Sequence, residues 1–213
     1  MKALQKMVAS DGYEVMLFPL PYMKITQGEN GSYSHRGTYN IDFVGWSKTG
    51  RVYHAPMYAP CSCKCVGTID ANNKGRIFQS LNKVHTPKGL QYVTFMNFHD
   101  NNPIAHKGDI FEQGQLYAHT GTAGIGTGDH THFNCASGKY NGWQQVPPDG
   151  HGQLINSTHI YWICYVNDTV IVDGYMYPWE QWTKPTKEDE VKKDEHKFPW
   201  AVYYRKFRKR NSR

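Results

Sequence analysis

Two histidines spaced two residues apart, His130 and His132, end a glycine-rich, turn-forming run at 117–133, YAHTGTAGIGTGDHTHF. In an extended strand, successive side chains point to opposite faces, so residues two apart share a face. Both imidazoles can therefore converge on one point. The pattern predicts a β-strand whose histidines belong to a metal site.

Further metal ligands are expected elsewhere in the chain. A catalytic zinc ion typically has three protein ligands of the His, Cys, Asp or Glu type and an open fourth position. The segment SHRGTYNIDFVG offers His35 and, seven residues later, Asp42, with glycines that permit tight backbone turns. A third candidate, His99, ends the β-branched and aromatic run YVTFMNFHD.

Taken in chain order, these residues resemble the M23 family of zinc endopeptidases, of the lysostaphin and LytM type, which cut peptide bonds in bacterial peptidoglycan. The resemblance runs from about Gln27 to Phe133. Besides the candidate ligands it includes YAP at 58–60, KGDIFEQGQ at 107–115 and GTGDHTHF at 126–133.

The resemblance implies a role for each of the five site residues. His35, Asp42 and His132 correspond to the zinc ligands. His99 and His130 correspond to catalytic residues that serve as general base for the attacking water and as donor to the oxyanion. The sequence does not assign one of these two roles to either histidine.

Three positions depart from the common family pattern. Six residues, RGTYNI, separate His35 from Asp42 where most members have three, and the longer spacing resembles a phage-encoded branch. Thr131 and Asn134 stand where the family often has leucine and glutamate. Neither is a ligand position, so the zinc assignment is unaffected.

The remaining histidines lack a family context, and surface or structural roles are expected for them. His119 is the exception, because it lies close to His130 and His132 in sequence. Its expected place is the lining of the cleft, either as a substrate-binding residue or as a contact that supports a metal ligand.

Composition predicts an all-β protein with minor α content. Aromatic residues make up 14% of the chain, and 20 glycines provide turns. Together with the resemblance, this predicts an antiparallel β-sheet of the LytM/lysostaphin type. A loop is expected at 139–157 and a short helix near 187–196. Strands are expected at 41–46, 52–58, 63–69, 76–79, 91–98, 109–111, 115–119, 130–135, 159–166 and 169–172.

Three cysteines alternate along one predicted strand, at Cys61, Cys63 and Cys65. The alternation would place their thiols on one face, as a thiolate metal site requires. Reduced cysteines facing the core as small apolar residues are the favoured interpretation. With Cys135 and Cys164 the chain has five cysteines, which cannot all pair, and a reducing cytoplasm does not favour disulfides.

The chain is expected to divide into a peptidase domain at 1–183, with its core motifs at 27–135, and a charged linker and basic aromatic tail at 184–213. Six of the last nine residues are Arg or Lys, and the net charge is +6. Such a charge favours attraction to anionic wall polymers through 198–213. Nucleic-acid binding by this tail, or a solubilising terminus, are the alternatives.

No run reaches the roughly 20 apolar residues of a membrane helix, so no membrane span is expected. The N-terminus lacks the apolar core of a Sec signal, because polar residues interrupt it. We therefore expect synthesis in the host cytoplasm without a Sec signal, and action on the cell wall as a released endolysin or a virion component.

The function expected from the resemblance is hydrolysis of peptidoglycan cross-link peptides with Zn²⁺ as cofactor, by a bacteriophage lysin used for release or for infection. Other virion tail proteins are further candidate partners, and nucleic acid is the least favoured one. The alternative is a non-catalytic wall-binding or tail-structural protein on the same scaffold. Retention of all five site residues argues against that alternative.

Overall fold

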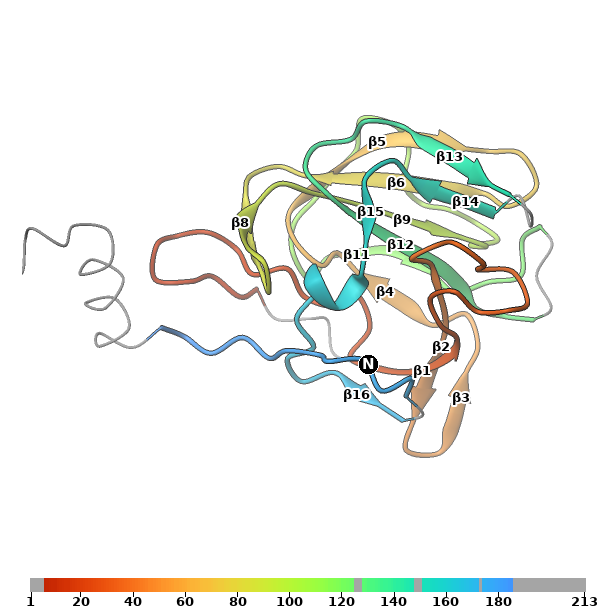
Figure 1. Cartoon of the computed structure of the whole chain (residues 1–213), viewed down its shortest axis with the longest axis horizontal. Helices are drawn as coiled ribbons and strands as arrows, with labels where there is room; N and C mark the ends of the chain where they lie inside the picture. Colours follow the sequence, from red (N-terminus) through yellow and green to blue (C-terminus); the bar gives the residue numbers. More distant parts are fainter. Residues whose placement is uncertain (1–5, 125–127, 148–150, 173, 186–213) are drawn as a thin grey trace, which may run out of the picture. The chain divides into compact units, whose positions relative to one another are not determined.

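Antiparallel pairing of short strands dominates the computed structural model of the chain (Figure 1), which describes residues 6–124, 128–147, 151–172 and 174–185. Contacts between backbones group Met1–Trp182 into one compact unit. In the described part, the main sheet has ten strands. They are β1 (Tyr22–Gln27), β2 (Ile41–Ser47), β3 (Gly50–Val52), β5 (Cys63–Ile69), β6 (Gly75–Ser80), β9 (Val93–Phe98), β10 (Ile110–Phe111), β12 (Thr131–Ser137), β15 (Ser157–Thr158) and β16 (Val170–Ile171).

The strand order across this sheet is β10, β5, β6, β9, β12, β2, β1 and β16, with β15 beside β12 and β3 beside β2. All of these pairs are antiparallel except β1 with β16. Three two-stranded sheets complete the described strands. They join β4 (Pro56–Tyr58) to β11 (Leu116–His119), β7 (Val84–Thr86) to β8 (Gly89–Gln91), and β13 (Trp143–Val146) to β14 (His151–Leu154).

The central strands bury both faces. All six residues of β9 are buried, and its side chains alternate between two apolar clusters. Phe95 packs in the larger cluster with Phe78 and Phe133. Met96 packs in the smaller cluster with Leu154 of the β13–β14 hairpin. A strand that is covered on both faces has a nearly continuous apolar sequence, and the sequence of β9, VTFMNF, follows this pattern.

The all-β, antiparallel fold class predicted from the sequence is confirmed. Three local predictions were wrong. The expected loop at 139–157 contains the β13–β14 hairpin, and the expected strand at 159–166 contains instead a 3₁₀ helix, η1 (Ile160–Trp162). The expected strand at 52–58 is divided, since residues 53–55 separate β3 in the main sheet from β4, which pairs with β11. The short helix expected near 187–196 lies outside the described residues.

Local hydrogen bonds explain the second error. The backbone N–H groups of Ile163 and Cys164 both donate to the carbonyl oxygen of Ile160, at 2.9 and 2.8 Å. These three residues are buried and follow the i, i+3, i+4 spacing of a helical face. The apolar run HIYWICYV therefore has a helical period in its buried positions.

All five cysteines are free and buried, and they pack in the larger apolar cluster. Burial raises the pKa of Cys61, Cys63 and Cys135, which keeps these thiols protonated. This agrees with the interpretation of reduced core residues. In the described part, no cysteine belongs to a group with the spacing of metal ligands. The same part contains no helix long and apolar enough to cross a membrane.

Candidate metal centre and cleft

Two adjacent strands and one loop bring the three predicted zinc ligands together. Asp42 on β2 and His132 on β12 are direct cross-strand partners. His132 is also paired with Phe98, the last residue of β9, so His99 follows at the same edge. His35 comes from the loop between β1 and β2. Residues far apart in sequence thus meet through strand register.

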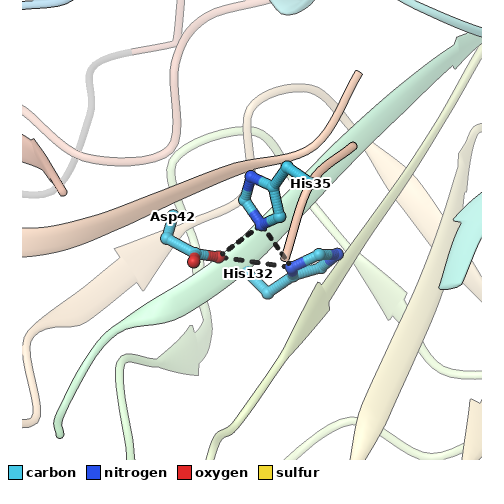
Figure 2. Close-up of side chains that lie close together, drawn as sticks. All are labelled: His35, Asp42 and His132. Atoms are coloured by element: carbon cyan, nitrogen blue, oxygen red, sulfur yellow. Dashed lines mark hydrogen bonds and ion pairs between the residues drawn. The ribbon is translucent and has the colours of Figure 1, made fainter. Parts of the chain in front are cut away.

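The three side chains point their ligand atoms at one another (Figure 2). The Nε2 atom of His35 lies 3.2 Å from Oδ1 of Asp42 and 3.2 Å from Nδ1 of His132. The distance from His132 Nδ1 to Asp42 Oδ1 is also 3.2 Å. A tetrahedral zinc with bonds of about 2.0 Å places its ligand atoms about 3.3 Å apart. The spacing fits such an ion, and this is the one group in the described residues with metal-ligand spacing.

Backbone carbonyls fix the tautomers of both candidate ligand histidines. Nδ1 of His35 lies 3.0 Å from the carbonyl oxygen of Gly28, and Nε2 of His132 lies 3.3 Å from that of Gly152. A carbonyl oxygen only accepts, so each of these nitrogens carries its ring's proton. The other nitrogen of each ring presents a lone pair to Asp42. Carbonyl partners of this kind orient metal-binding histidines.

Three acceptor atoms facing one another require a positive charge between them, which is either a proton or a metal ion. Burial lowers the pKa of His132, although Asp42 partly offsets this, so a proton there is disfavoured. Burial raises the pKa of the Asp42 carboxyl, but His132 and His35 more than offset this and hold it below its usual range. Gln27 donates to the second carboxylate oxygen at 3.1 Å. The donor set therefore fits a divalent cation such as Zn²⁺.

The two predicted catalytic histidines lie side by side next to this centre. The ring centroids of His99 and His130 are 4.5 Å apart. Nδ1 of His99 donates to the carbonyl of Ala123, and Nδ1 of His130 donates to that of Gly128, both at 2.7 Å. Each Nε2 therefore keeps its lone pair. Burial, together with the nearby His130, lowers the pKa of His99 to about 4, so this ring is neutral near pH 7.

A cleft of about 790 Å³ opens over the centre. Asp42, His99, His130 and His132 line it, while His35 lies fully buried beneath. The other lining residues are mostly small or polar: Thr26, Gln27, Gly31, Ser32, Tyr33, Ser34, Val44, Arg51, Asn73, Gly128 and Tyr175.

His119, predicted to contact substrate, is not among the residues that line this cleft. Its ring stacks on His54, with centroids 4.3 Å apart and planes within 9°. Its Nδ1 lies 3.8 Å from Oδ2 of the buried Asp100. The structure thus places His119 in a packed pair of histidines at the end of β11 (Leu116–His119).

Two supporting residues were not predicted from the sequence. Gln27 orients Asp42, and its Nε2 also donates to Ser34 at 2.7 Å. Asp129 anchors the segment that contains His130 and leads into β12, because its carboxylate accepts from Thr120 Oγ1 at 2.6 Å and from the backbone N–H of His54 at 2.9 Å. Asp129 could have been identified from the sequence, because it directly precedes His130. Nothing in the sequence indicated a supporting role for Gln27.

Comparison with curated proteins finds relatives of this chain, among them a bacteriophage protein. The chain is 38% identical over 173 residues to Morphogenesis protein 1 of Bacillus phage B103. The match covers 80% of this chain and 45% of the phage protein, so the chain spans about half the length of that relative. No family model matches the chain.

Several solved structures are similar to the chain. A zinc containing peptidase from Vibrio cholerae has a TM-score of 0.41 and 19% identity, covering 61% of this chain and 42% of the other. The catalytic domain of the prophage-encoded M23 protein EnpA from Enterococcus faecalis has a TM-score of 0.40 and 15% identity. The match covers 55% of this chain and 85% of the EnpA domain. Lysostaphin from Staphylococcus simulans has a TM-score of 0.44 and 15% identity. The match covers 78% of this chain and 61% of lysostaphin. These structures include members of the family that the sequence resembles.

Proposed function

We propose that this chain is a zinc endopeptidase of the M23 type that hydrolyses peptide bonds in bacterial peptidoglycan. The observation that carries the proposal is the convergence of His35 Nε2, Asp42 Oδ1 and His132 Nδ1 at mutual distances of 3.2 Å, at the base of an open cleft. Two further histidines, His99 and His130, line the same cleft beside these residues. The five residues are those that the sequence resemblance assigns to the reaction.

In this proposal, His35, Asp42 and His132 hold the metal. A zinc ion bound there supplies a Lewis acid for the scissile carbonyl and lowers the pKa of water towards about 7. The carbonyls of Gly28 and Gly152 keep both imidazoles in the tautomer that binds a cation. Gln27 keeps Asp42 turned towards the centre.

His99 and His130 move the protons. Each ring is held by its Nδ1–H, so its Nε2 can accept a proton from the attacking water. The imidazolium that results can donate to the oxyanion on the substrate or to the departing amine. Because the rings are adjacent, one can act as base through its neutral Nε2 while the other, once protonated at Nε2, donates to the oxyanion.

A phage origin is part of the proposal. The identity to a Bacillus phage protein supports it, as does the long spacing between His35 and Asp42. The relative's name refers to morphogenesis, which favours a lysin that belongs to the virion over a freely released endolysin. In either case the substrate proposed is the cross-link peptide of the wall.

The deciding experiment is digestion of purified peptidoglycan sacculi by the zinc-loaded chain, followed by mass spectrometry of the fragments. New amino termini within cross-link peptides are the expected result, and they identify the bond that is cut. A protein with full zinc occupancy that binds sacculi and releases no new termini would be the non-catalytic wall-binding alternative.

A further inference from the structure

Arg51 is the one permanent cation among the described residues that line the cleft. It lies on β3 (Gly50–Val52), which is paired with β2 through Trp46 opposite Arg51. The same sheet carries Asp42 further along β2. A rigid hairpin therefore presents this guanidinium to the cleft beside the proposed zinc centre.

The guanidinium is held in place by two contacts. Its Nη2 donates to the carbonyl oxygen of Asp129, and its Cζ lies 4.9 Å from the centroid of the Tyr53 ring. Gly128 leaves space beside it, since a Cβ atom at that glycine would lie 3.7 Å from Nη2. Stacking and one hydrogen bond fix a planar group that has five N–H donors, so donors remain for a ligand.

No carboxylate in the described residues forms an ion pair with Arg51. The carboxylate of Asp129, whose backbone carbonyl binds Arg51, accepts instead from Thr120 and from the backbone N–H of His54. Arg51 thus presents an unbalanced positive charge at the wall of a cleft whose base holds the carboxylate of Asp42.

We propose that Arg51 binds a carboxylate of the peptide substrate, next to the bond that is cut. The inference rests on the proposed peptidase function and deepens it by naming the substrate class: stem peptides with a free carboxylate on a residue that flanks the scissile bond, rather than their carboxamides. Arginine pairs with carboxylates through two parallel hydrogen bonds, a geometry that a neutral amide does not reproduce. Arg51 is bonded to the residue before His130, which places the bound carboxylate beside the catalytic pair.

The test uses the zinc-loaded full chain and two synthetic peptides. They contain the bond identified in sacculi and differ only in a carboxylate or a carboxamide on the flanking residue. We expect kcat/KM to be roughly 10- to 100-fold higher for the carboxylate peptide, as one charged hydrogen-bonded pair implies. Arg51→Gln should bring this ratio close to one, mainly through KM. Arg51→Lys should retain part of it.

The ratio of the two substrates is the chosen readout because Arg51 also holds the Asp129 carbonyl. Loss of that contact can slow both peptides equally, but it cannot change their ratio. Lys48→Gln is the matched control, since it removes one positive charge from the exposed turn of the same β2–β3 hairpin outside the cleft. This variant should keep the wild-type ratio.

Two results would overturn the inference: equal kcat/KM for both peptides in the wild type, or an unchanged ratio in Arg51→Gln. If zinc-loaded wild type releases no new termini from sacculi, the proposed peptidase function fails instead. Calorimetric titration with stem peptides in carboxylate and carboxamide forms then decides about Arg51 separately. Equal affinity for both, or equal loss of affinity in Arg51→Gln, would refute the carboxylate site.

Discussion

At the scale of single residues, the proposed zinc ligands give the most direct prediction. Asp42→Ala removes the one charged ligand and leaves two neutral histidines, so we expect zinc content to fall from one ion per chain towards zero. Elemental analysis of purified protein measures this. Gln27→Leu serves as a graded comparison, because losing a partner of a ligand typically weakens metal binding about 10- to 100-fold without abolishing it. Full zinc occupancy in Asp42→Ala would contradict the ligand assignment.

Variants of the proposed catalytic residues His99 and His130 are predicted to separate zinc binding from chemistry. His99 and His130 donate through Nδ1 to backbone carbonyls and lie outside the group of ligand atoms. His99→Ala or His130→Ala should therefore keep zinc and lose about 10²-fold or more in kcat, the scale of a lost acid-base group or oxyanion donor. Loss of zinc from either variant would make that histidine a ligand instead.

Acid should destabilise the metal-free protein through His99. Its pKa is about 4 when folded, against 6.5 in its ordinary state. The unfolded chain thus binds more protons between these values, so stability falls as pH falls through this window. From pH 7 to 5 the loss should be about 2 kcal/mol, measured by urea unfolding of chelated protein. His99→Gln should show a smaller decrease, and an equal decrease in both proteins would exclude this cause.

At the scale of elements, the strands that carry the site could be predicted because their local patterns are strong. The run ending at His99 is β-branched and aromatic, and the spacing of His130 and His132 requires an extended segment. The 139–157 segment was missed because its turn residues outweighed two short polar strands. The partners Gln27, Arg51 and Asp129 could not be assigned, since their contacts depend on strand register and loop packing.

The aromatic segment after β16 lies outside the predicted motif region and packs against the loop that carries His35, a proposed zinc ligand. The Glu29 N–H donates to the Tyr177 hydroxyl at 2.8 Å, and the preceding Gly28 provides the carbonyl that orients His35. A Cβ atom at Gly28 would lie 2.5 Å from that hydroxyl and 2.6 Å from Cδ1 of Tyr175. The loop that bears His35 therefore packs closely against these two rings.

Gly28→Ala is accordingly predicted to cost about 1 to 3 kcal/mol of stability, the range for an overpacked site. It should also weaken zinc binding, because the carbonyl that orients His35 must move with the rings. Thermal denaturation and zinc titration measure the two effects. Gly174→Ala is the matched control, since a Cβ there would meet only Ile171 at 3.6 Å. A Gly28→Ala protein with normal stability and zinc affinity would show that the contact is unimportant.

At the scale of the whole molecule, the net charge of +6 comes partly from a terminal segment outside the described residues. The proposal for this segment is that it concentrates the enzyme on an anionic wall without taking part in catalysis. Such attraction is screened beyond about 8 Å at physiological ionic strength, and more strongly at high salt. The compact unit that contains the site ends at Trp182, so the five site residues are all within it.

Deletion of 198–213 should therefore reduce binding to sacculi at low salt, leave it little changed at high salt, and spare hydrolysis of a small soluble peptide. A full-length variant with Gln at its basic positions keeps Phe198, Trp200 and Tyr203, and so separates charge from packing. If charge is the cause, this variant should show the same loss of wall binding at low salt as the deletion. The basic positions replaced by Gln are Arg205, Lys206, Arg208, Lys209 and Arg210. If the deletion lowers the melting temperature and the Gln variant does not, the aromatic residues stabilise the fold. Unchanged wall binding by the Gln variant would exclude the electrostatic role.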